Sequence, residues 1–404
     1  MVEYPSAMQP FPRLDSTLPG PSGAPIRLRR AAVTDMRRIR ALYAEVYGAN
    51  YPLSMILDPA QMRRAIESPS CYWLLAEFQG RIVASLVFEL DHAQRIAKAF
   101  GAVVVKAHRK HDLANTMMAA VMRELTGARP RADAVYATTR TVTTAPQHMT
   151  ENLGFAKLGI FPNAHKVFEH ETHCLAAYFT PAALRRRRTP VVLIPELEPF
   201  HRLVRGQLDL GRPILRKTAV RPAAGPAREL LSFESISAPH FVRHRFARQR
   251  NRGVFATTFV PFHEPNLLLV TPDQKTEVYL HHGRPDRSSL ILGGHTNETD
   301  SALVFDSIAT ALNALGVSYI ELLVDAYSPE IQAQALSARF LPSAYFPAFR
   351  RVGGRRWDYI VFSRSFEILD FRNVRLISIY RDFLKEYFKA WQTLYINQAF
   401  QAPL

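Results

Sequence analysis

The side chains best placed for ligand chemistry lie within residues 103–118, where the sequence reads VVVKAHRKHDLANTMM. Three valines predict the end of a strand, and the basic residues Arg109, Lys110 and His111 lead directly into an apolar helix that begins near Leu113. The first backbone N–H groups of a helix have no partner inside the helix, and the helix dipole favours an anion there. This order of strand, basic turn and helix therefore predicts a phosphate site.

Asp112 stands between the basic residues and the helix. An aspartate is a good N-cap for a helix that begins near Leu113. Its carboxylate would also place a negative charge where an anionic ligand should lie. The alternative to a phosphate site is an ordinary solvated helix start, and the elements around the turn bear on this choice.

The hydrophobic pattern predicts a regular succession of strands and helices on both sides of this turn. Period-two alternation indicates strands, and apolar residues three and four apart indicate helices. Gln79, Gly80 and Arg81 separate two strand-like runs and favour a hairpin. The expected elements are a strand at 26–31, a helix capped by Thr34 and Asp35, strands at 73–78 and 82–88, a helix at 113–125, a strand at 134–139, a helix at 145–153 and a strand at 172–179.

Residues 109–114 resemble the Arg/Gln-x-x-Gly-x-Gly/Ala loop with which GNAT N-acetyltransferases hold the pyrophosphate of acetyl-CoA, although Asp112 replaces the central glycine. The order of elements over residues 25–180 is similar to that family, and so is the helix ending in Leu-Gly-Phe at Phe155. Residues 139–163 also resemble the β-lysine N-acetyltransferases. The resemblance implies an α/β (α+β) fold, in which a mixed and mostly antiparallel sheet is flanked by helices, and an acyl-CoA-dependent N-acyltransferase of EC 2.3.1 type.

The resemblance implies that acetyl-CoA or another acyl-CoA is the co-substrate. In the family, the backbone of the strand before the loop holds the pantetheine arm and polarises the thioester carbonyl. The cofactor-binding residues carried over on this basis are Val103, Val104, Val105, Arg109, Lys110, His111, Asp112, Leu113, Ala114 and Asn115.

The sequence identifies the catalytic groups less clearly than the cofactor-binding residues. Family members often use a tyrosine five residues before the phenylalanine of Leu-Gly-Phe to protonate the leaving thiolate, and here that residue is Thr150, a much poorer acid. No glutamate lies within residues 97–105, where the family's base is most common. His165 and His173 are therefore the candidate catalytic bases, because the unperturbed pKa of histidine suits proton transfer near neutral pH. The alternative is that both are ordinary surface or loop histidines.

The second half of the chain repeats these features. Phe340 and Phe346 are separated by the same spacing as Phe155 and Phe161, and a proline follows each pair. Around them we expect a helix at 301–315, a strand at 318–324, a helix at 329–340 and a strand at 357–362. Self-similarity of this kind is the signature of a duplicated unit, so we predict two GNAT-like modules in tandem.

Residues 293–300, GGHTNETD, occupy the place in the second half that the basic turn has in the first. The acidic side chains of Glu298 and Asp300 would repel a pyrophosphate. A helix cap by Thr299 or Asp300 explains these residues without a ligand. We therefore expect the second module to be a degenerate copy that binds no acyl-CoA.

Length and composition agree with two globular domains, because 404 residues exceed one ordinary core and 48% of them are hydrophobic. We expect a disordered leader at 1–24, an N-terminal GNAT domain at 25–180, a Pro/Arg-rich linker at 181–228 and a degenerate GNAT-like domain at 229–404. A closing amphipathic helix at 374–395 is expected to pack on its own domain, with a homodimer face as the alternative.

The only cysteines are Cys71 and Cys174, so neither a disulfide framework nor a metal site is expected. No apolar run approaches the roughly 18 residues that would indicate a membrane span. No signal peptide is visible either, and we expect a cytoplasmic protein.

The formal net charge of +16 and two arginine-rich stretches, at 185–188 and 242–252, raise an alternative function. A non-catalytic basic protein could bind nucleic acid or an acidic partner through such stretches. No zinc finger, helix-turn-helix or aromatic RNA-binding motif accompanies them, and a solvated linker also explains arginine. We therefore favour an enzyme. The likeness to β-lysine acetyltransferases favours a small-molecule amine over a protein lysine as the acceptor.

Overall fold

The computed structural model describes residues 14–20, 23–48, 54–166, 170–220, 229–255 and 259–396. The chain divides into two compact units that interleave along the sequence. The first unit comprises Met1–Thr139, Thr144–Ala156 and Ala176–Arg185, and the second comprises Arg140–Thr143, Lys157–Leu175 and Arg186–Leu404. Strand β8 (His170–Phe179) therefore begins in the second unit and ends in the first.

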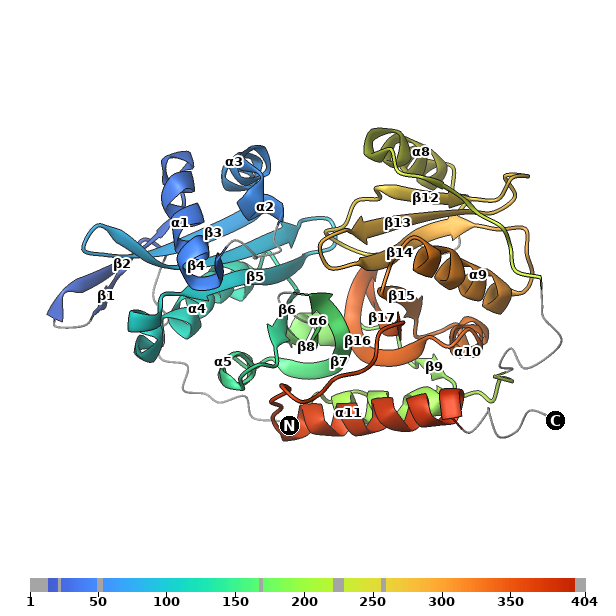
Figure 1. The fold of residues 1–404 in the computed structure, drawn as a ribbon. Coiled ribbons are helices and arrows are strands. Elements are labelled where there is room, and N and C mark those ends of the chain that lie inside the picture. Colours follow the sequence, from blue (N-terminus) through green and yellow to red (C-terminus); the bar gives the residue numbers. More distant parts are fainter. Residues whose placement is uncertain are drawn as a thin grey trace. The chain divides into compact units, whose positions relative to one another are not determined.

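The first unit is a sheet with helices packed against it (Figure 1). Neighbouring strands are antiparallel from β1 to β5, whereas β5 and β6 are parallel. The strands are, in spatial order, β1 (Thr17–Pro19), β2 (Pro25–Arg30), β3 (Cys71–Phe78), β4 (Arg81–Asp91), β5 (Ile96–Val104), β6 (Ala134–Arg140) and the end of β8. The helices are η2 (Val33–Asp35), α1 (Met36–Tyr47), α2 (Ser54–Leu57), α3 (Pro59–Glu67), η4 (Lys106–His111), α4 (Leu113–Thr126), α5 (Ala145–Asn152) and α6 (Pro181–Arg185).

Strands β3 and β4 read as nearly continuous apolar runs, because both of their faces are covered. Helix α1 packs on β4 and β5, and helix α4 packs on β3, β4 and β5. Met117, Val121 and Leu125 recur every four residues along α4 and are all buried. Burying a side chain of this size contributes about 1.5–3 kcal/mol. The core therefore holds the turn between β5 and α4 in place.

The second unit has a sheet of the same kind. Its strands are antiparallel neighbours except β14 and β15, which are parallel. They are, in spatial order, β11 (Glu234–Ile236), β12 (Leu267–Val270), β13 (Glu277–Gly283), β14 (Ser288–His295), β15 (Tyr319–Asp325), β17 (Arg355–Ser365), β16 (Leu341–Val352), β7 (Ala156–Lys166) and the start of β8. The other elements are β9 (Val192–Leu193), η5 (Pro195–Leu197), α7 (Glu198–Arg205), β10 (Ile214–Leu215), α8 (Pro239–Asn251), α9 (Ser301–Ala314), α10 (Pro329–Ser337), α11 (Ser378–Trp391) and a π-helix (Gln392–Ile396).

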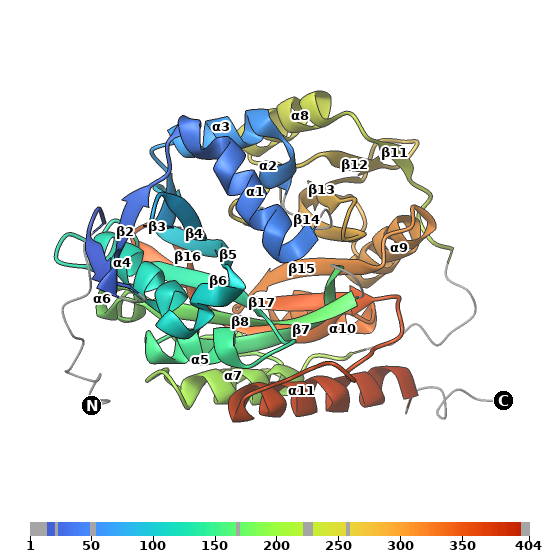
Figure 2. The same cartoon turned by 60° about the vertical axis from the view of Figure 1, so that its left-hand side comes forward.

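Strands β7 and β16 pair at Gly159 and Ala344. A Cβ atom on Gly159 would lie 2.1 Å from the carbonyl oxygen of Ser343, so this close pairing requires glycine. Helices α7 and α11 lie side by side along this part of the sheet (Figure 2). The ring centroids of Phe200 and Phe383, one from each helix, are 6.2 Å apart. The predicted closing helix thus packs on its own unit.

The same strand order occurs twice along the chain. It is β2-β3-β4-β5-β6-β8-β7 in the first half and β11-β12-β13-β14-β15-β17-β16 in the second. In each half a helix, α4 or α9, connects the two parallel strands. The mixed, mostly antiparallel α/β architecture is the fold class that the sequence predicts.

Two segments that the sequence predicts to be unstructured are folded in part. In the leader, β1 pairs with β2, and Leu14 and Leu18 pack against the core of the first unit. In the linker, Leu193, Phe200 and Val204 are buried in the second unit. These few apolar residues are obscured by the surrounding prolines and arginines, so composition predicted a linker. The predicted limits of the two repeated modules, 25–180 and 229–404, stay predictions.

Among the described helices, none is both long and apolar enough to cross a membrane. Cys71 and Cys174 are free and buried. Burial raises the pKa of the Cys71 thiol to about 12, which keeps that side chain protonated and unreactive. No cluster of three or more potential metal ligands occurs in the described part of the chain.

Candidate functional site

Strands β5 and β6 separate part-way along their length. In the described sheet they pair in parallel no further than Ala99 and Ala137, whereas β5 continues to Val104. The N–H of Val105 donates to the Val83 carbonyl of β4 at 3.0 Å. Because the backbone groups of successive residues point to opposite edges of a strand, those of Val104 face away from β4. The end of β5 therefore presents a backbone edge that β6 does not cover.

Strand β5 bulges at Gly101 and Ala102. Its register with β4 shifts between Ser85 and Val87, so that two residues of β5 lie opposite one residue of β4. Gly101 has a φ of 64°, a left-handed conformation that glycine adopts without steric cost. The bulge lies just before the uncovered edge and changes the direction of the backbone groups there.

Two tyrosines of α1 bind the carbonyl groups of this bulge. The phenol of Tyr43 donates to the Gly101 carbonyl and lies 3.3 Å from the Ser85 Oγ. One helical turn later, Tyr47 donates to the Ala102 carbonyl at 3.5 Å. Tyr43 is buried, and burial raises the pKa of its phenol, so the group stays a protonated donor. Helix α1 thus fixes the shape of the bulge.

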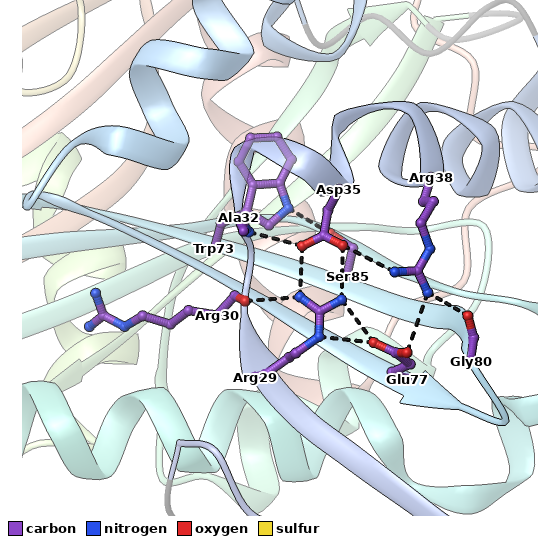
Figure 3. Close-up of polar contacts among 9 residues, drawn as sticks. All are labelled: Arg29, Arg30, Ala32, Asp35, Arg38, Trp73, Glu77, Gly80 and Ser85. Carbon is purple, nitrogen blue, oxygen red and sulfur yellow. Dashed lines mark hydrogen bonds and ion pairs between the residues drawn. The ribbon is translucent and has the colours of Figure 1, made fainter.

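An ion network anchors the start of α1 (Figure 3). Arg29 on β2 donates to the two carboxylate oxygens of Asp35 at 2.7 and 2.8 Å and to Glu77 on β3 at 2.9 Å. Arg38 donates to Asp35 at 3.2 Å. The hydrogen bonds from Arg29 lower the pKa of Asp35 and of Glu77. The predicted cap is wrong here: Asp35 precedes α1 but bonds no N–H of it, because its carboxylate turns back to Arg29 and to the Ala32 N–H.

Sequence reasoning missed the residues that hold Tyr43 in place at the bulge. Trp73 Nε1 donates to the Ser85 Oγ at 2.9 Å, and Ser85 in turn contacts Tyr43 (Figure 3 shows the first pair). From the sequence, Tyr43 was recognisable only as one of the apolar residues at helical spacing. The one available signal was Gly101, because a glycine inside a strand pattern often marks a bulge.

The turn between β5 and α4 consists of η4 and Asp112. Asp112 adopts the left-handed conformation, with φ 52° and ψ 24°, at the N-cap of α4. Its carboxylate bonds no helix N–H and instead accepts from Asn115 Nδ2 at 2.9 Å, which corrects the predicted cap. An N-cap residue normally reaches the second or third N–H from an extended backbone, and the left-handed backbone removes that geometry. The first N–H groups of α4 therefore have no side-chain cap.

The structure distributes the predicted cofactor-binding residues over β5, η4 and α4. The side chains of Val103 and Val105 are buried in the core, so only their backbones can meet a ligand. Val104 is half-buried at the uncovered edge. Arg109 is exposed in η4, and its Nε donates to the Val104 carbonyl at 3.2 Å. The strand end and the basic turn are therefore in direct contact.

The remaining loop residues lie at the junction with α4. Lys110 and His111 belong to η4, and their side chains lie outside the described residues. Leu113 is buried, whereas Ala114 and Asn115 are half-buried in the first turn of α4. The Asn115 Oδ1 is buried and has no hydrogen-bond partner among the described residues.

The candidate histidines belong to the second unit, and the β5–α4 turn belongs to the first. His173 on β8 is buried, with its Nε2 3.8 Å from the Glu171 Oε2. Arg140 donates to both oxygens of Glu171 at 2.7 and 2.6 Å. Burial raises the pKa of Glu171, but His173 and Arg140 outweigh it and hold the pKa at about 2. His165 lies on β7, and its side chain lies outside the described residues.

Thr150 stands where family members often have the acid. It is buried in α5, and its hydroxyl donates to the Gln147 carbonyl of the same helix at 2.8 Å. A hydroxyl held in this way, with a pKa far above that of a phenol, is no proton donor for a thiolate. Catalytic roles for His165 and His173 stay predictions.

The corresponding turn in the second unit is built differently. Strand β14 also bulges, because its register with β13 shifts between Tyr279 and Leu280. The carboxylate of Asp300 accepts the N–H groups of Ala302 and Leu303 at 3.0 and 3.3 Å and so caps α9. Asp300 is one of the two caps that the sequence predicts. It satisfies the N–H groups that an anionic ligand would need.

Solved structures that this chain resembles include GNAT acetyltransferases. A GNAT-family acetyltransferase from Streptococcus pneumoniae is 18% identical, with a TM-score of 0.34, and the match covers 38% of this chain and 99% of that chain. The ribosomal-protein-alanine N-acetyltransferase from Brucella melitensis is 15% identical, with a TM-score of 0.33, and the match covers 38% of this chain and 99% of that chain. Arabidopsis thaliana NAA60 in complex with acetyl-CoA is 12% identical, with a TM-score of 0.33, and the match covers 38% of this chain and 98% of that chain. Neither a protein-family model nor a curated protein matches.

Proposed function

We propose that the first unit binds acyl-CoA and transfers its acyl group to an amine by direct attack, as an N-acyltransferase of EC 2.3.1 type. One observation carries the proposal. An uncovered strand edge at Val104 and a helix start without a side-chain cap, after Asp112, meet at the same basic turn. These are the backbone groups that a pantetheine amide and a pyrophosphate need, and they lie next to each other in the chain.

The residues present fit such a co-substrate. The N–H groups of Leu113, Ala114 and Asn115 would hold the pyrophosphate, with Arg109 adding positive charge. Asp112 is the unfavourable charge in this set. Its carboxylate accepts a hydrogen bond from Asn115 Nδ2 at 2.9 Å, and this bond partly offsets the negative charge. The backbone of 103–105 would hold the pantetheine arm.

The bulge at Gly101 and Ala102 supports the acyl-transfer part of the proposal. Acyl-CoA supplies an activated acyl group as a thioester. A backbone N–H in a fixed bulge can polarise the thioester carbonyl, because a preorganised donor needs no rearrangement during the reaction. The hydrogen bonds from Tyr43 and Tyr47 provide this rigidity.

Proton transfer is assigned to the histidines as a proposal. The attacking amine must lose a proton, and His173 or His165 would accept it. Thr150 is not a candidate acid for protonating the leaving thiolate. Because a thiol has a pKa near 8.5, the thiolate can leave without an acid, at some cost in rate.

We further propose that the second half is a duplicated module that no longer binds acyl-CoA, because Asp300 caps the helix start that would be needed. Its role would be to shape the acceptor site. We favour a small-molecule amine as acceptor and a cytoplasmic location. A non-catalytic basic protein is less favoured, because Arg187 of the arginine run is buried in an ion pair with Asp358 rather than free for a polyanion.

The test is isothermal titration of the full chain with acetyl-CoA and with CoA. We expect one saturable site, lost in Arg109→Glu, because the reversed charge would repel the pyrophosphate from an exposed turn. The matched control is Arg123→Glu, an exposed charge reversal in the last turn of α4. Unchanged binding by Arg109→Glu, or equal loss in both variants, would contradict the proposal.

A further inference from the structure

Helix α8 carries positive charge that acyl transfer does not use. The sequence of the helix, PHFVRHRFARQRN, contains four arginines and two histidines and no acidic residue, and Arg252 follows directly. The helix packs on β12 at one edge of the second unit (Figure 1). Its inward side chains, Val242 and Phe246, are buried in a small cluster with Leu268 and Tyr279. The rest of the helix surface is available to solvent.

Two of the arginines have structural roles. Arg243 donates to Glu264 at 3.1 Å. Arg245 pairs with the buried Glu277, and the hydrogen bond that Arg245 donates to this carboxylate raises the pKa of Arg245. These residues tie α8 to the sheet, so they are not the ones available to a partner.

Four of the other exposed residues form a continuous stripe, which we call the α8 stripe. It consists of Phe241, His244, Arg248 and Arg252, which follow one another at spacings of three, four and four residues and so share one face. Four residues of helix rise about 6 Å, so the cations are regularly spaced. Within the described residues, neither Arg248 nor Arg252 forms an ion pair.

The aromatic residue of the stripe is the second unusual feature. Phe241 is 47% exposed, although a phenylalanine of a small helix would ordinarily be buried. At the same end of the helix, Arg284 from the β13–β14 hairpin donates to Ser237 at 3.3 Å and adds another cation. Phe241 therefore shares a helix face with Arg248 and Arg252, and a further cation is held at Ser237, four residues before the ring.

A solvated helix with a favourable dipole does not explain this arrangement. Arginines in the last turn stabilise the helix dipole, which accounts for Arg248 and Arg250. The first turn should then favour acidic residues, yet it contains none. The dipole also gives no reason to expose Phe241.

We infer that the α8 stripe binds single-stranded nucleic acid. Arginine forks match phosphate oxygens, and an exposed aromatic ring offers a platform on which an unpaired base can stack. The formal charge of +16 attracts a polyanion from a distance. An acidic peptide offers carboxylates to the arginines, whereas every nucleotide of an unpaired nucleic acid offers both a phosphate for the arginines and a flat base for Phe241.

The test is fluorescence anisotropy of the full chain with a labelled oligouridylate of about 12 nucleotides at 50 and 200 mM salt. With about three phosphates neutralised, affinity should fall about 20-fold between these conditions. Arg248→Glu with Arg252→Glu should weaken binding at least about tenfold, because two contacts become repulsive. The matched control reverses Lys385 and Lys389 to Glu, two exposed lysines four residues apart on α11, and changes net charge equally.

Four outcomes decide the inference. Weaker binding in the α8 variant but not in the α11 control supports it, and so does a loss in Phe241→Ala that appears with oligouridylate but not with inorganic polyphosphate. Equal loss in both charge variants would mean attraction by net charge alone and would overturn it. Tighter binding of a polyglutamate peptide than of the oligonucleotide would also overturn it, in favour of an acidic protein partner.

Discussion

The phenol of Tyr43 on α1 donates a hydrogen bond to the carbonyl of Gly101, the residue at which β5 bulges. These residues are 58 positions apart in the sequence. The bond joins a helix to β5, whose end is not covered by β6, so the shape of the proposed acyl site depends on a side chain outside it. The same relationship identifies a variant that should affect acyl recognition and leave CoA binding intact.

Tyr43→Phe should weaken acetyl-CoA binding about fivefold and leave CoA binding unchanged. The variant removes only the hydroxyl that fixes the bulge, and a lost hydrogen bond of this kind costs about 1 kcal/mol. CoA has no acyl carbonyl and should not sense the bulge. Calorimetric titration of both ligands measures the difference. Tyr380→Phe is the control, because it deletes a buried phenol that donates to the Leu175 carbonyl in the second unit. Equal weakening of both ligands would refute the assignment.

Asp112→Gly should tighten CoA binding severalfold. The change removes a negative charge at the helix start and supplies a residue that adopts φ 52° freely. Asp112→Ala removes the same charge but keeps a Cβ in the left-handed region, so it should be about 1–2 kcal/mol less stable than Asp112→Gly. Both variants should therefore gain affinity, and the alanine variant should melt at a lower temperature than the glycine variant. A glycine variant with weaker CoA binding would show that the carboxylate assists the site.

Arg29→Met should destabilise the first unit by about 2 kcal/mol at pH 7, because Asp35 and Glu77 lose a charged donor in a largely buried network. The native pKa of both carboxyls is lowered, so their stabilisation is present above the unfolded pKa values of about 4 and is lost as pH falls through the native ones. The difference in the free energy of unfolding between wild type and variant should therefore shrink below about pH 4.

Urea unfolding at pH 7, 5, 4 and 3 measures this gap. Arg40→Met is the control, since Arg40 is exposed on α1. A gap that stays constant with pH would rule out the ion network as the source of the stability.

Within the arginine run, substitution at neighbouring positions should have unequal effects. Arg187 is buried, and its Nε donates to the two oxygens of Asp358 at 3.0 and 3.1 Å, whereas Arg186 is exposed. Arg187→Met leaves a buried carboxylate with only the Tyr345 phenol and a backbone N–H, and should cost about 3–5 kcal/mol. Arg186→Met should be neutral. Thermal unfolding of both variants tests this, and similar melting temperatures would show that the run is merely solvated.

Local sequence was sufficient for the elements and for the candidate turn. Apolar spacing along α4 and the alternation of β2 depend on neighbouring residues only, so periodicity found them. The arrangement of a strand end, basic residues and a helix start at 103–118 is equally local. The repeated spacing at Phe155 and Phe340 indicated that the second half resembles the first, and the strand order is the same in both.

Tertiary structure decided what the local pattern left open. The left-handed conformation of Asp112, the turn of Asp35 toward Arg29 and the burial of Arg187 against Asp358 each depend on partners or packing that periodicity does not encode. A residue type predicts which bonds a side chain can form, but its choice among them is made by the groups that folding brings within about 3 Å. For this chain, the sequence determined the order of its elements and the chemistry at the turn, and folding determined which charged groups remain available there.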